Sequence, residues 1–180
     1  MQKNLSAWQL GGFVFTAVAG TLLHFAYDWS GQSILIAPFS AVNESIAEHM
    51  KLLYFPMLVY TLIQSGFLKP RPEGFFCAKL IGTAAGLLLI PVLFYTYTGA
   101  LGVFSHWFNV TIFFLAAALS YTLETVLLSR AKLPCPYPKV ALALLFLIGI
   151  AFVVFTFFPV RIPLYQDPNT GLIGRSQPLF

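Results

Sequence analysis

Five apolar segments, each long enough to cross a lipid bilayer, constrain this chain more than any other feature of its sequence. A helix rises about 1.5 Å per residue, so about 20 residues cross the hydrocarbon layer. The segments cover residues 8–27, 44–66, 77–97, 105–128 and 138–158. Backbone groups in hydrocarbon must pair within their own segment, so each segment is predicted to be a helix. The expected fold class is all-α: a polytopic helical membrane protein with about five transmembrane helices.

The composition also favours a lipid environment. Only 9% of the residues are charged and 58% are hydrophobic, whereas a soluble domain carries about 25% charged residues. The formal charge of +4 comes mostly from Lys and Arg in short connections and forms no basic stripe. The bilayer is therefore the expected partner, and no nucleic-acid partner is expected.

The distribution of basic residues predicts the orientation of the bundle. The basic residues assigned to the inner side are Lys3, Lys69, Arg71, Lys79, Arg130, Lys132 and Lys139. Only Arg161 and Arg175 fall on the other side, so the positive-inside rule places the N-terminus in and the C-terminus out. Residues 1–180 are then expected to form a single transmembrane bundle with an extracytoplasmic tail over residues 159–180.

Two further expectations follow from this orientation. The first segment loosely resembles a secretory signal peptide, but its apolar run continues to Tyr27, so an uncleaved helix is expected. Cys77 and Cys135 both fall on the cytoplasmic side, where thiols are kept reduced, so two unpaired thiols are expected.

The predicted topology brings the polar ends of three helices to the outer leaflet. Charged groups in a spanning helix cost roughly 2.5–3.5 kcal/mol each on insertion scales, so they usually serve a purpose. Residues three or four positions apart share a helix face, and Glu48 and Lys51 are spaced to form an ion pair. The candidate ligand-binding residues are Asp28, Asn43, Glu44, Glu48, His49, Lys51 and Asn109. Together they predict an outward-facing polar pocket.

Three classes of function fit this pocket. Binding or transport of an ion or small polar solute leads, because the cluster mixes both charges and contains no His-x-x-x-His spacing. The alternative is a metal-dependent, membrane-embedded hydrolase acting on a lipid or peptide. Zinc or another divalent metal would be its cofactor, and Glu44 or Glu48 its catalytic carboxylate. The candidate metal ligands are His24, His49, His106 and Asp28. The third class is a structural or assembly subunit, and the short chain favours a homo-oligomer or a membrane partner protein.

Two other polar features lie outside this cluster. Asp167-Pro168-Asn169-Thr170-Gly171 is typical of a tight turn, and it predicts an ordered tail that lies over the polar face, either as a lid or with no functional part. Glu124, near the inner end of the fourth segment, is expected to pair with Arg130 or another basic residue at that face.

Two segments carry a resemblance to known proteins. Residues 42–51 (Val-Asn-Glu-Ser-Ile-Ala-Glu-His-Met-Lys) and residues 167–174 (Asp-Pro-Asn-Thr-Gly-Leu-Ile-Gly) resemble small bacterial multi-pass membrane proteins catalogued only as a domain of unknown function. That resemblance implies the bacterial cytoplasmic membrane and no particular activity. Ser45-x-x-x-His49 also resembles one element of the adiponectin-receptor and alkaline-ceramidase membrane hydrolases, but the second histidine motif and two of their seven spans are missing.

Overall fold

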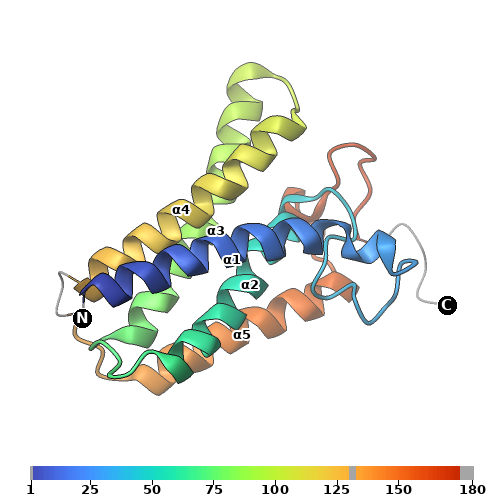
Figure 1. Cartoon of the computed structure of the whole chain (residues 1–180). Coiled ribbons are helices and arrows are strands. Elements are labelled where there is room, and N and C mark those ends of the chain that lie inside the picture. The colour runs from blue at the N-terminus through green and yellow to red at the C-terminus, as the bar shows by residue number, and fades with distance from the viewer. Residues whose placement is uncertain (1, 130–132, 175–180) are drawn as a thin grey trace.

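The computed structural model describes residues 2–129 and 133–174, and helices dominate them (Figure 1). The helices are α1 (Gln2–Trp29), α2 (Ile46–Phe67), α3 (Phe75–Leu101), α4 (His106–Ser129) and α5 (Pro138–Phe157), followed by the short 3-10 helix η1 (Pro163–Tyr165). Extended pairing in the described residues is confined to an isolated bridge between Gln166 and Ile173. The predicted all-α class and the five predicted helices are confirmed.

Four of these helices have the length and apolarity needed to cross a membrane: Asn4–Trp29 within α1, and the whole of α3, α4 and α5. Their outer surfaces expose large apolar side chains, including Leu10, Leu88, Phe114 and Leu147. Exposed apolar surface on this scale is typical of contact with lipid. The chain is therefore a membrane protein, and its orientation relative to the bilayer stays a prediction.

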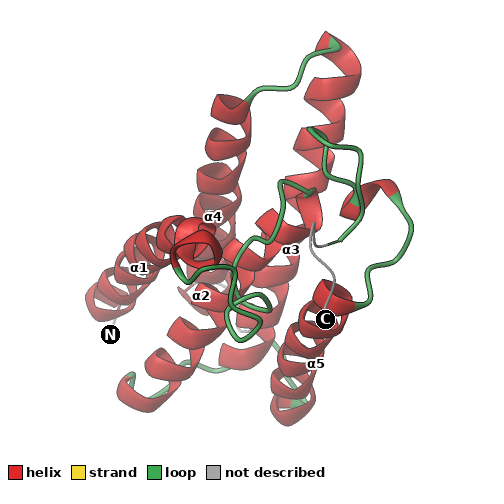
Figure 2. Cartoon of the chain, turned by 90° about the vertical axis from the view of Figure 1, so that its right-hand side faces the viewer, coloured by secondary structure: helices red, strands yellow, loops and turns green. Residues whose placement is uncertain are grey.

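Helix α2 differs from the other four because it lies inside the bundle. It contacts α1, α3, α4, α5 and η1, and more than half of its residues are buried. The end-on view in Figure 2 shows α2 between α1 and α3. This central position explains how α2 keeps Glu48, Lys51 and Gln64 away from lipid.

The helices are in close contact on one side of the molecule and diverge on the other. A Cβ atom on Gly20 of α1 would lie only 2.6 Å from the Leu52 carbonyl oxygen of α2 and 2.6 Å from the ring of Phe113 on α4. Small residues allow such close approach between membrane helices. Beyond this contact, the hairpin formed by the end of α3 and the start of α4 leans away from α1 (Figure 1).

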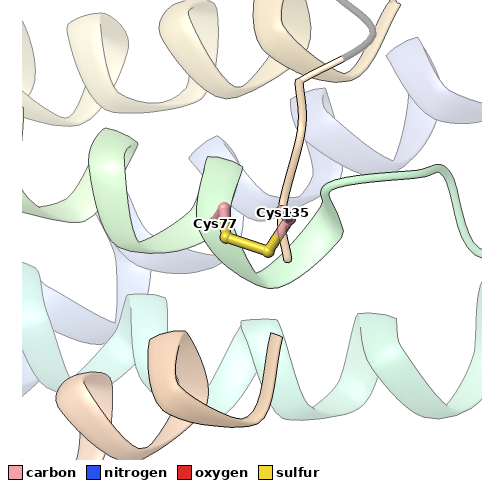
Figure 3. Close-up of a disulfide and its surroundings, with 2 residues drawn as sticks. All are labelled: Cys77 and Cys135. Atoms are coloured by element: carbon pink, nitrogen blue, oxygen red, sulfur yellow. A yellow bond between two sulfur atoms is a disulfide. The ribbon is translucent and has the colours of Figure 1, made fainter. Parts of the chain in front are cut away.

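A disulfide joins Cys77 in the first turn of α3 to Cys135 in the connection before α5, so the expectation of two unpaired thiols is wrong (Figure 3). The two Cα atoms lie 5.9 Å apart although 58 residues separate them in sequence. The connection folds back onto the start of α3, where a Cβ atom on Gly74 would lie 2.7 Å from the Leu133 carbonyl oxygen. Three residues counted for the orientation, Arg130, Lys132 and Arg175, lie outside the described residues.

Candidate metal centre and its cavity

His24, Glu44 and His49 meet where α1 ends and α2 begins. His24 Nε2 lies 3.8 Å from Glu44 Oε1, and His49 Nε2 lies 3.5 Å from Glu44 Oε2. One ligand atom from each residue lies within 4.8 Å of the others. Two ligands bound tetrahedrally to zinc at 2.0–2.2 Å are about 3.4 Å apart, so the spacing is close to that of a metal site.

A backbone contact orients the His49 ring. His49 Nδ1 lies 2.9 Å from the Ser45 carbonyl oxygen one helical turn earlier. A carbonyl oxygen can only accept a hydrogen bond, so Nδ1 is the donor in this contact, and Nε2 is the ring nitrogen directed toward Glu44. Metal-ligating histidines commonly donate their second ring nitrogen to a carbonyl in this way. The contact uses the Ser45 backbone and not its hydroxyl, which is buried and has no hydrogen-bond partner in the described part of the chain.

A cavity of about 290 Å³ lies next to the three ligand atoms, between α1, α2 and α4. Its polar lining consists of Thr21, His24, Glu44, His49, His106 and Asn109. Its apolar lining consists of Gly20, Phe25, Leu52, Val110, Phe113 and Phe114. All three histidines of the chain therefore line one cavity, whose wall is mostly apolar.

His106 and Asn109 line this cavity from the first turn of α4 without belonging to the ligand group. The Tyr97 hydroxyl donates a 2.8 Å hydrogen bond to Asn109 Oδ1. This bond fixes the amide orientation, so the Asn109 NH₂ group remains as a donor. Both side chains are therefore placed to contact a ligand that reaches the metal-ligand group.

Glu48 and Lys51 form a separate, buried ion pair, as their spacing predicted. Lys51 Nζ lies 2.6 Å from Glu48 Oε2, and it also donates to the Ala37 carbonyl at 3.0 Å and to Thr156 Oγ1 at 2.9 Å. The Val42 backbone N–H donates to the same carboxylate oxygen at 2.9 Å. The pair thus ties the connection before α2 to α2 and α5. Neither residue lines the cavity, so Glu44 is the carboxylate that faces it.

The described part of the C-terminal tail, residues 159–174, contacts the start of α2 and the connection before it. Asp167 Oδ1 accepts hydrogen bonds from Asn169 N at 2.7 Å and Thr170 N at 3.3 Å, which confirms the predicted turn. Asn43 Nδ2 donates to the Gly174 carbonyl at 2.8 Å. Burial raises the pKa of the Tyr165 hydroxyl, and the nearby negative charge of Glu48 raises it further. Asn43 therefore anchors the tail and does not line the cavity.

Asp28 lies outside the group of candidate metal ligands. It lies in the last turn of α1, is exposed, and uses its backbone carbonyl to accept a hydrogen bond from Gly31 N. The group of ligand atoms within 4.8 Å does not include it. Glu44, and not Asp28, is therefore the acidic member of the candidate metal-ligand group.

A second polar network lies near the opposite end of the bundle. Lys79 Nζ of α3 lies 2.5 Å from Glu124 Oε2 of α4, and both side chains are fully buried. Gln9 of α1 donates to the same carboxylate oxygen at 3.0 Å and accepts from Lys79 at 3.2 Å and from Gln64 of α2 at 3.1 Å. The partner of Glu124 is therefore Lys79, while Arg130 lies outside the described residues.

From the sequence, Lys79 is expected near a connection between helices, and Gln9 and Gln64 have no predicted role. The signal available was the presence of glutamine within apolar segments, because polar groups in spanning helices usually face the bundle interior. A hydrogen-bond network that joins four helices around one buried carboxylate depends on packing and is not visible in residue spacing.

Comparison with protein-family models matches residues 1–175 to the Family of unknown function (DUF6512). No curated protein and no solved structure matches the chain, and nothing in these comparisons supports the likeness to adiponectin receptors and alkaline ceramidases. Because the match spans nearly the whole sequence, the chain belongs to this family of unknown function.

Proposed function

We propose that this protein is a metal-dependent membrane hydrolase that binds a divalent transition metal, with zinc as the best fit, through His24, Glu44 and His49. The observation that carries the proposal is the convergence of two imidazoles and one carboxylate on one point beside a cavity. Two histidines and one glutamate form a ligand set used by catalytic zinc sites, which keep a fourth position for water or substrate.

The protein's own residues fit this role. The contact between His49 Nδ1 and the Ser45 carbonyl holds the ring with Nε2 directed toward Glu44. Bound zinc would supply Lewis acidity and a water of lowered pKa. His106 lines the cavity outside the ligand group, so it is placed to exchange a proton with a ligand there, and the Asn109 amide is placed to donate to a carbonyl oxygen.

The geometry favours this function over transport of a small polar solute. Transport needs polar groups along a path through the bundle. Below the histidines, however, Leu52 and Phe113 line the cavity and pack against Gly20 of α1. Glu48 and Lys51, two of the candidate solute-binding residues, form an ion pair with each other. What remains at the cavity is a ligand set suited to a metal.

The test is the metal content of protein purified without chelators and then incubated with zinc. We expect about one zinc per chain, as in other sites with three protein ligands. His24→Ala, Glu44→Gln and His49→Ala should lose it. The matched controls are His106→Ala, which alters a cavity histidine outside the ligand group, and Asp28→Asn, which alters a nearby carboxylate outside it. Both should keep the metal.

Wild-type protein that binds no zinc would overturn the metal site, as would equal zinc in wild type and His49→Ala. The hydrolase activity is tested separately by comparing zinc-free and zinc-loaded protein on a panel of ester and amide substrates. Hydrolysis that needs zinc and is lost in Glu44→Gln supports the proposal. A zinc-loaded protein with no hydrolysis above the zinc-free sample would leave a metal-binding protein without this activity.

A further inference from the structure

The cavity next to the candidate metal ligands changes from polar to apolar along its length. On α4, His106 and Asn109 lie in the first turn, whereas Phe113 and Phe114 lie two turns further along the helix. At 1.5 Å per residue, this difference corresponds to a depth of roughly 10 Å. A ligand that fills the cavity must therefore have a polar end and an apolar end.

The apolar part of the cavity faces lipid. Phe25 of α1 is 45% exposed and Val110 of α4 is 48% exposed, although both line the cavity. Both helices are long and apolar enough to cross the membrane. Figure 1 shows the α3–α4 hairpin leaning away from α1 on this side. The two exposed lining residues belong to two helices that can cross the membrane, so the mouth of the cavity is expected between α1 and α4, on the side that meets hydrocarbon.

A ligand that fills the cavity must match both its polar end and its apolar end. Water gains few hydrogen bonds among Phe25, Val110 and Phe114, so an apolar chain is favoured there. The volume of about 290 Å³ equals that of roughly ten water molecules, which suits part of one acyl chain and not a bulky double-chain lipid. At the polar end, the Asn109 NH₂ group and the metal-ligand group favour an oxygen-bearing, anionic head.

We infer that the cavity binds a single-chain lipid carrying a carboxylate, of the fatty-acid class. Its head lies at the His24–Glu44–His49 group and its chain leaves between α1 and α4. This inference rests on the proposed function, because the bound metal supplies the positive charge that the carboxylate meets. It also narrows the substrate class of the hydrolase, since a fatty acid is the product released from a single-chain acyl ester or amide.

The experiment is photo-crosslinking of the zinc-loaded protein in lipid nanodiscs with a diazirine-bearing hexadecanoic acid, followed by mapping of the labelled peptides. Val110→Trp places a large side chain in the lateral opening without changing a metal-ligand residue. Val126→Trp is the matched control, because Val126 is also exposed on α4 and does not line the cavity. We expect label on the cavity residues of α1 and α4, and about tenfold less label in Val110→Trp than in Val126→Trp. Equal labelling of the two variants would overturn the inference.

A competition measurement on the wild-type protein needs no variant. Unlabelled hexadecanoic acid should displace the probe, and hexadecane should not, because only the acid has a head for the polar end. Equal displacement by both would mean that the probe is simply dissolved in hydrocarbon around the protein, and would overturn the inference. Zinc content measured on the same samples distinguishes a failure of the proposed metal site from a failure of the proposed lipid site. Protein without zinc contradicts the proposed function, whereas zinc-loaded protein with unspecific labelling contradicts the lipid site alone.

Discussion

Two groups of polar side chains lie at opposite ends of the same bundle, and they are built in opposite ways. In the group formed by Lys79, Glu124, Gln9 and Gln64, contacts are 2.5–3.2 Å long and connect four helices. In the group formed by His24, Glu44 and His49, the imidazole nitrogens approach the carboxylate oxygens to 3.8 and 3.5 Å, and a cavity lies beside them.

The difference separates a network suited to holding helices together from a group suited to binding a ligand. In the first group, opposite charges satisfy each other inside a low-dielectric interior, which fixes the register of the helices and leaves little room for a ligand. In the second group, two imidazole nitrogens and a carboxylate face one another at distances too long for hydrogen bonds. They are partly exposed and gain little from each other, so a bound cation is what would complete them.

The largest expected effect comes from breaking the Lys79–Glu124 pair. Lys79→Ala leaves a fully buried carboxylate without its cation and should lower the free energy of unfolding by about 3–5 kcal/mol. Thermal unfolding in detergent measures the change. The matched control is Lys139→Ala, because Lys139 is exposed at the start of α5 and its loss should change stability by less than about 0.5 kcal/mol.

A double replacement sharpens this test. Lys79→Met combined with Glu124→Leu removes both charges together and should recover most of the loss, since well-packed apolar residues often replace a buried ion pair without cost. If Lys79→Ala were no more destabilising than Lys139→Ala, this ion pair would not be holding the helices together.

The second expected effect belongs to the metal-ligand group and appears only with metal. Zinc at about 100 times its dissociation constant should stabilise the wild-type protein by about 2.7 kcal/mol, because it binds the folded form. His24→Ala and His49→Ala should abolish this gain while changing the stability of the zinc-free protein by about 1 kcal/mol or less, because long contacts between partly exposed groups contribute little. A large loss in the zinc-free state would show that this group is structural, like the Lys79–Glu124 pair.

The helices were predictable because hydrocarbon imposes strict requirements on length and backbone pairing. Segments predicted at residues 105–128 and 138–158 correspond to α4 and α5 with a difference of at most one residue at each boundary. The central position of α2 was not predictable, because length and apolarity do not show which helix the others surround. The pairing of Cys77 with Cys135 was missed for a similar reason: it depends on how the connection before α5 folds back.

The sequence could predict only the end of the bundle at which the site lies. Alternating helix directions put His24, His49 and His106 at one end of the bundle, and the structure places all three on one cavity. Topology could not show that Glu48 contacts Lys51 while Glu44, which lies just before α2, faces the histidines. It also could not show the apolar part of the cavity, which depends on the divergence of α4 from α1.

A smaller effect tests how closely the helices pack around the Lys79–Glu124 pair. A Cβ atom on Gly82 of α3 would meet the Glu124 side chain and lie 3.0 Å from the Ser120 carbonyl oxygen. Gly82→Ala should therefore destabilise the protein by about 1–3 kcal/mol, the usual range for overpacking. Gly99→Ala is the control in the same helix, because a Cβ atom there would meet nothing within 4 Å. Unfolding measurements that show equal stability for the two variants would contradict tight packing at Gly82.

The smallest effect concerns the tail, whose turn is held by the Asp167 side chain and not by contacts with the cavity. Asp167→Ala removes the acceptor of the Asn169 and Thr170 N–H groups, and losing such bonds costs about 1 kcal/mol each. Amide hydrogen exchange over residues 165–174 should therefore become about fivefold faster or more. Asn169→Ala should leave exchange unchanged, because the structure gives only the Asn169 backbone a role in the turn. Asp167→Ala also removes a long contact, 3.4 Å from the Glu44 backbone N–H to Asp167 Oδ2. Zinc content should still be the same in both variants, because this contact involves the Glu44 backbone and not its carboxylate. Zinc lost together with the turn would instead make the tail part of the metal site and would give it the role of a lid.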